Sequence, residues 1–177
     1  MPKKPTTTRE DMIKGTFELI RKQGHEALSV RNLARQLDCS TQPIMYQFKD
    51  LEKLKDEVYA FADKYHSDYI LKEKDLLKIG LRYIRFAHEE SNLFRFLFQS
   101  GHFDGFSLSE LIKAPEAGSL LETAAADLHL PKKEAIKKFE ILFVLVHGYA
   151  SLICNNAITY NERSIRNTLL KMVKERK

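Results

Sequence analysis

Between Ser29 and Lys49 the sequence contains side chains whose chemistry suits binding to a nucleic acid. Ser29, Arg31 and Lys49 carry a hydroxyl, a guanidinium and an ammonium, and all three groups bind phosphate oxygens. Gln42 has an amide that can donate to and accept from the edge of adenine at the same time. The first 49 residues contain nine Lys and Arg against five Asp and Glu, so they hold most of the net charge of +5. A local positive excess of this kind favours a polyanionic partner.

Patterns for catalysis or metal binding are missing from the sequence. It contains no Gly-x-Ser-x-Gly, no glycine-rich phosphate loop and no paired zinc motif. His88-Glu89-Glu90 begins like a helical zinc site, but Asn92 stands where the second histidine is needed. We therefore expect neither an enzyme nor a metal or cofactor site.

Cysteine usage and hydropathy indicate the environment of the protein. Cys39 and Cys154 lie far apart and form no metal-binding spacing, which is typical of a reduced cytoplasmic protein. The longest apolar run, Ile141–Val146, is far shorter than the roughly 20 residues of a membrane span. No apolar stretch follows Lys3 and Lys4, so no signal peptide is predicted. We expect a soluble, cytoplasmic protein without a membrane partner.

The elements that would position these side chains are all helical. Apolar residues recur at three- and four-residue steps, and the chain has only 7 Gly and 5 Pro. Thr8 and Asp11 can cap the first helix and Gly24 can end it. The pattern predicts an all-α fold of about nine helices, over 9–23, 30–37, 41–48, 51–66, 73–89, 92–99, 107–128, 132–156 and 161–175.

The second and third of these helices form the most informative pair. Ser29 can cap the second helix, and Asp38-Cys39-Ser40 forms a three-residue turn before the third. Both helices are too short to be stable alone, so they must pack on the first helix. This arrangement is typical of a helix-turn-helix, whose second helix enters the major groove of DNA.

The stretch Leu28–Leu54 resembles the signature of the tetracycline-repressor (TetR) family of transcription regulators. The residues that match without a gap are Leu33, Ala34, Ser40, Phe48, Lys49 and Leu54. The sequence departs from the signature at Asp38, Met45 and Gln47, where the family usually has Gly, Tyr and His. Asp tolerates the left-handed backbone that the glycine position requires, so the turn can survive.

The resemblance implies a DNA-binding domain over residues 1–50 and a helical effector-binding and dimerisation domain over 51–177. It implies a ligand-responsive repressor that binds a palindromic operator in double-stranded DNA as a homodimer. By position, the residues that would face the groove are Thr41, Gln42, Met45 and Tyr46, whereas Ser29, Arg31 and Lys49 would bind phosphates.

The second two-thirds of the chain is expected to bind a small-molecule effector of unknown identity. Tyr83–Phe98 resembles one subgroup of TetR C-terminal domains, and Val146–Gly148 resembles that subgroup's His-Gly motif, with Phe143 in the place of its usual Trp. The expected pocket residues are Tyr83, Phe86, Phe98, His147 and Tyr149. The alternative for each ring is ordinary core packing.

The resemblance also implies that the last two helices pair with their copies in a four-helix bundle. The expected dimer residues are Ile141, Leu145, Leu152, Ile165, Leu169 and Met172. Part of this apolar stripe must instead face the protomer's own core, and periodicity does not divide the two. Because Met45 and Gln47 depart from the signature, a second function stays open. It is a helical ligand-binding or interaction module that has lost DNA binding.

Overall fold

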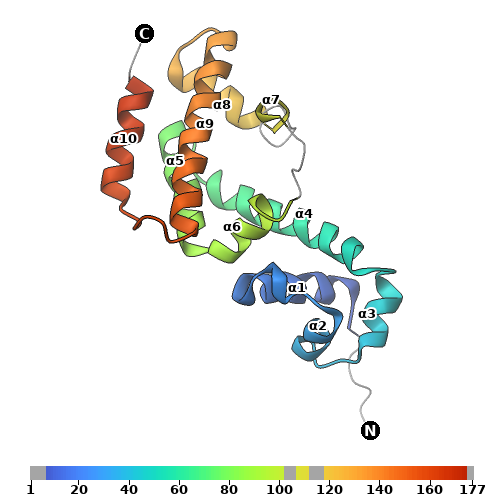
Figure 1. Ribbon diagram of the computed structural model, residues 1–177. Helices are drawn as coiled ribbons and strands as arrows, with labels where there is room; N and C mark the ends of the chain where they lie inside the picture. The colour runs from blue at the N-terminus through green and yellow to red at the C-terminus, as the bar shows by residue number, and fades with distance from the viewer. Residues whose placement is uncertain (1–6, 102–106, 112–117, 175–177) are drawn as a thin grey trace. The chain divides into compact units, whose positions relative to one another are not determined.

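Every regular element in the described residues is helical (Figure 1). The structure is a computed structural model that describes residues 7–101, 107–111 and 118–174. The first helices are α1 (Arg9–Gln23), α2 (Val30–Gln36), α3 (Thr41–Gln47), α4 (Leu51–Ile70) and α5 (Leu76–Glu89), with one turn of 3₁₀-helix, η1 (His25–Ala27), after α1. They are followed by α6 (Ser91–Phe98), α7 (Leu108–Leu111), α8 (Gly118–Leu128), α9 (Lys132–Cys154) and α10 (Glu162–Lys174). The predicted all-α fold is confirmed.

Side chains cap the helices where the sequence predicts them. The Thr8 hydroxyl accepts from the Asp11 amide at 3.1 Å, and the Asp11 carboxylate accepts from the Thr8 amide in return. The Ser29 hydroxyl accepts from the Asn32 amide at 3.2 Å at the start of α2. Gly24 ends α1 with a φ of 85°, a left-handed conformation that glycine adopts at no steric cost.

Two helices differ in extent from the prediction, and a third can be compared only at its two ends. The helix expected over 51–66 continues to Ile70. The helix expected over 107–128 corresponds to α7 and α8, and residues 112–117 between them lie outside the described residues. The helix expected from residue 73 begins at Leu76, because the Asp75 carboxylate caps it by accepting from the Lys78 amide at 2.9 Å.

Packing divides the chain into two compact units. The first unit holds α1, η1, α2, α3, the part of α4 up to His66, and α6. The second unit holds the last turn of α4, α5, and α7 to α10. These units are defined by contacts, and a division by function into 1–50 and 51–177 stays a prediction.

In the first unit, α1 lies at the centre and packs against α2, η1 and α6. The ring of Phe17 contacts those of Phe61 and Tyr65 edge-on, with centroids 5.1 and 5.2 Å apart. Arg21 forms an ion pair with Glu90 just before α6. The helix-turn-helix is therefore held by α4 and α6 as well as by its own three helices.

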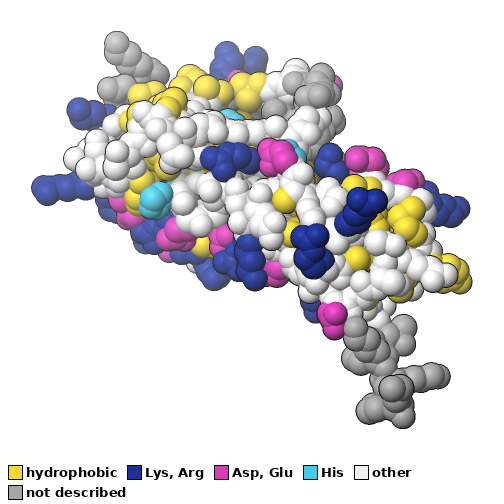
Figure 2. Space-filling view, turned by 60° about the horizontal axis from the view of Figure 1, so that its bottom comes forward, with side chains coloured by type: hydrophobic (Ala, Val, Ile, Leu, Met, Phe, Trp, Pro, Cys, Tyr) yellow, Lys and Arg dark blue, Asp and Glu magenta, His cyan; other side chains and the backbone are white. Residues whose placement is uncertain are grey.

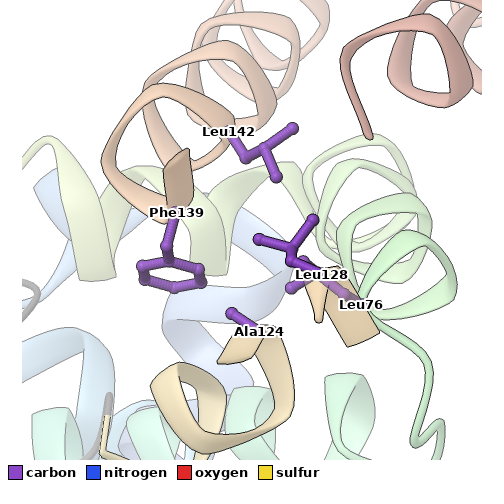
Figure 3. Packing of buried hydrophobic residues seen from close by; sticks show 5 residues of the cluster. All are labelled: Leu76, Ala124, Leu128, Phe139 and Leu142. Atoms are coloured by element: carbon purple, nitrogen blue, oxygen red, sulfur yellow. The ribbon is translucent and has the colours of Figure 1, made fainter. Parts of the chain in front are cut away.

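In the second unit, α5 packs against α8, α9 and α10. Its core joins Leu76 of α5 to α8 and α9 through Ala124, Leu128, Phe139 and Leu142 (Figure 3). Gly80 lets α5 approach α9 closely, because a Cβ at this position would lie 3.2 Å from Val146 Cγ2. In the described part of the chain, no helix is both long enough and apolar enough to cross a membrane.

Candidate nucleic-acid interface

Helix α3 has a buried side and an exposed side. Ile44 and the following Phe48 are buried in the first unit. The four residues predicted to face the groove, Thr41, Gln42, Met45 and Tyr46, are all exposed. Because they stand at positions i, i+1, i+4 and i+5, the 3.6-residue period places them on one face of the helix. The predicted set thus lies on the exposed side of α3, where Gln47 is exposed as well.

The turn before α3 has the geometry that a helix-turn-helix requires. Asp38 adopts a left-handed backbone with a φ of 48°, as expected for the position where the family signature has glycine. The Cys39 amide donates to the Ala34 carbonyl at 3.0 Å, which closes the end of α2. Leu33 and Ala34 are buried beside α3, so the second and third helices pack on each other directly after the turn.

Arg9 fixes the end of α3, and sequence reasoning did not single it out. Its Nη1 donates to the Gln47 carbonyl at 2.8 Å, and its guanidinium lies 4.2 Å from the centroid of the Phe48 ring. The same group pairs with Glu57 of α4, with Nε 3.1 Å from Oε2. The partners lie 38 and 48 residues away in the chain, so no local pattern could have revealed them.

The three predicted phosphate ligands differ in whether their polar groups already have a partner within the protein. The Ser29 hydroxyl oxygen already caps α2, and its O–H remains able to donate. Arg31 and Lys49 are exposed and form no ion pair with any residue in the described ranges. On the face of the molecule drawn in Figure 2, Lys and Arg side chains occur singly or in small groups with Asp and Glu among them. Positive charge beside α3 therefore comes from individual flanking residues.

Four of the five predicted pocket residues lie in the second unit, and Phe98 lies in the first. Within the second unit, the Tyr83 hydroxyl and His147 Nδ1 are joined by a hydrogen bond of 2.9 Å. The His147 ring stacks on Phe143, with centroids 5.9 Å apart and planes 19° apart, and burial lowers the pKa of His147. Phe143 thus pairs with the histidine, as its predicted substitution for the family's Trp suggests.

The other three predicted pocket residues have separate partners. Phe86 is fully buried and contacts Tyr69 edge-on at 5.4 Å. The Tyr149 hydroxyl donates to Thr168 Oγ1 of α10 at 3.3 Å. Phe98 belongs to the first unit, where its ring lies 4.9 Å from that of Phe94. Of these three residues only Phe86 is buried, and Phe98 and Tyr149 are half-buried.

The predicted dimer residues divide by helix. On α9, Ile141 and Leu152 are 57% and 47% exposed, and Leu145 is half-buried. On α10, Ile165 and Leu169 are buried within their own protomer, and Met172 packs against the core of the second unit.

An exposed apolar stripe therefore follows α9 rather than both helices. Val144, which is 54% exposed and was not predicted, joins the stripe at the helical spacing. A Cβ at Gly148 would meet nothing within 4 Å, so this position of the stripe lies open.

Comparisons with known proteins bear on the C-terminal part of the chain. A search of characterised proteins finds no match. The family model described as "Tetracyclin repressor-like, C-terminal domain" matches residues 76–174, from the first residue of α5 to the last of α10. This match covers more than half of the chain and is independent of the signature in residues 28–54. The chain therefore belongs to the tetracycline-repressor (TetR) family.

Proposed function

We propose that this protein is a transcriptional regulator that binds double-stranded DNA through α3. The observation that carries the proposal is the exposed face of α3, which presents Thr41, Gln42, Met45 and Tyr46 from a helix whose last turn is hydrogen-bonded to Arg9. A major groove admits one α-helix, and a helix-turn-helix inserts its second helix there. Ser29, Arg31 and Lys49 are the proposed phosphate ligands.

The regulator acts as a homodimer in this proposal. The α9 stripe of Ile141, Val144, Leu145 and Leu152 is apolar and largely exposed, and covering it by a second copy removes this surface from water. Gly148 allows the backbone of a partner helix to approach closely. Two-fold symmetry then presents two α3 helices to the two halves of a palindromic operator.

A small-molecule effector controls the DNA-bound state, with repression as the output in its absence. The Tyr83–His147–Phe143 group supports an effector site in residues 51–177, since it joins polar atoms to aromatic surface. The effector acts by binding preferentially to a conformation in which the two α3 helices have the wrong separation. The protein is then a cytoplasmic regulator without enzymatic activity.

The proposal is tested by selecting duplexes from random DNA with the full-length protein and measuring their binding at several salt concentrations. Binding should weaken steeply with salt, because phosphate contacts release counterions. Gln42→Ala should reduce affinity by about 1–3 kcal/mol at one base pair in each half-site. Gln99→Ala is the matched control, since Gln99 is an exposed glutamine of the same unit outside the helix-turn-helix.

If no duplex is enriched, the result favours the alternative function, a helical ligand-binding or interaction module that has lost DNA binding. If duplexes are enriched but Gln42→Ala leaves the base preference unchanged, Gln42 does not read a base.

A further inference from the structure

The segment that contains α3 has no charged side chains. Cys39–Phe48 has no Asp, Glu, Lys or Arg in ten residues, although 30% of the whole chain is charged. Asp38 and Lys49 flank this segment on either side. The face that α3 offers to a partner therefore consists only of neutral polar and apolar groups.

The apolar part of this face is unusually open. Tyr46 is 86% exposed and Met45 is 49% exposed. Neither residue is needed to fill the core of the first unit, because Ile44 and Phe48 occupy the buried side of the helix. Exposed apolar surface of this size gains free energy when a partner covers it.

The major-groove edges of the four bases differ in how well they match such a face. Guanine offers two acceptors, which Arg or Lys binds best, and α3 contains neither. Thymine alone presents a methyl group, which is recognised by apolar contact. Adenine offers a donor and an acceptor side by side, which match the amide of Gln42.

We propose that α3 reads A·T base pairs, with Met45 and Tyr46 covering thymine methyl groups and Gln42 binding an adenine edge. This inference rests on the proposed function as a DNA-binding regulator, and it adds the class of base pair that the protein selects. Sequence-independent affinity comes from Arg31 and Lys49, which bind phosphates outside the uncharged segment.

The test begins with the duplexes that the full-length protein selects from random DNA. Their half-sites should hold A·T pairs at the positions that α3 covers. Each thymine in a selected half-site is then replaced by deoxyuridine, which removes the methyl group and leaves the base pair intact. Loss of a contacted methyl should weaken binding about fourfold, the equivalent of about 0.8 kcal/mol for one buried carbon group.

Variants assign the contacts. In Met45→Ala or Tyr46→Ala, deoxyuridine at the contacted position should have no further effect, because the apolar partner of the methyl is gone. Lys49→Gln is the matched control. It should keep the full deoxyuridine effect and reduce the slope of log affinity against log salt by about one. Thermal melting by circular dichroism checks that each variant is folded. If a variant is unfolded, the deoxyuridine effect measured with the unaltered protein still tests the inference.

Three results would count against the inference in different ways. Selected half-sites with G·C pairs under α3 overturn it and leave the proposed function intact. Selected A·T-rich sites that bind equally well with deoxyuridine at every position also overturn the inference and leave the proposed function intact. Failure to select any duplex overturns both the inference and the proposed function.

Discussion

His66 lies in α4 with its imidazole buried in the first unit. Its ring meets that of Phe98 edge-on, with centroids 5.2 Å apart. Burial penalises the charged form of the ring and lowers the pKa of His66 from 6.5 to about 3. The folded protein therefore binds fewer protons than the unfolded chain below pH 6.5, so protonation in this range favours unfolding.

The free energy of unfolding should consequently fall as the pH drops below about 6.5. A single histidine with this shift costs about 2 kcal/mol between pH 7 and pH 5, since one pKa unit corresponds to about 1.4 kcal/mol. Urea denaturation at the two pH values measures the loss. His66→Gln should lose about 2 kcal/mol less than the unaltered protein over this interval.

His88→Gln serves as the control because His88 is exposed on α5, and this variant should retain the pH dependence. Equal losses for His66→Gln and the unaltered protein would show that another group is responsible.

At the scale of elements, the short helix α3 depends on α1 and α4 for its position. The Arg9 guanidinium joins the Gln47 carbonyl, the Phe48 ring and the Glu57 carboxylate. Each of these contacts is modest at the surface, because water and salt screen an exposed ion pair. Together they attach the last turn of α3 to both neighbouring helices.

Arg9→Ala should lower the free energy of unfolding by about 1–2 kcal/mol, from the lost cation–π contact, ion pair and hydrogen bond. It should also weaken DNA binding, although Arg9 is not proposed to contact DNA. Lys14→Ala is the matched control. It removes another exposed α1 cation, whose partner Glu10 lies in the same helix. Denaturant unfolding measures the stability of both variants, and DNA titration measures their affinity. Equal stability and equal affinity of the two variants would refute a role for Arg9 in holding α3.

The elements also show which features the sequence could predict. Helix starts and the turn depend on residues within four positions of each other, as with Thr8 and Asp11 or the left-handed Asp38, so local patterns identified them. The predicted end of the fourth helix near residue 66 was wrong, since α4 continues to Ile70 and residues 67–70 contain no Gly or Pro that would mark an end.

The candidate site was predictable only in part, for a related reason. The exposed set on α3 follows from helical period and the family signature. The Arg9 contacts and the burial of Ile165 and Leu169 depend on residues distant in the chain, and no periodicity encodes them.

At the scale of the whole molecule, the proposed dimer depends on α9 alone for its exposed apolar surface. Leu152→Glu should therefore place an unpaired charge against the second copy and raise the dimer dissociation constant on the order of 100-fold or more. Sedimentation equilibrium should show a species of the 20.6 kDa chain mass where the unaltered protein has twice that mass.

The same variant should lose affinity for a full palindrome and keep its affinity for an isolated half-site. Lys78→Glu, at an exposed position of α5, is the control and should remain dimeric. A dimeric Leu152→Glu variant would place the interface elsewhere.

The first unit is built from two separate stretches of chain, and this limits how such regulators can be recombined. The polypeptide passes between the units three times, because α5 belongs to the second unit and α6, which follows it, belongs to the first unit with α1. A chimera that joined residues 1–50 to the ligand-binding part of a relative would leave behind Glu90 and Phe96, the partners of Arg21 and His25. Exchange of DNA specificity between relatives must therefore transplant α6 together with the recognition helix, or rebuild the surface that it covers.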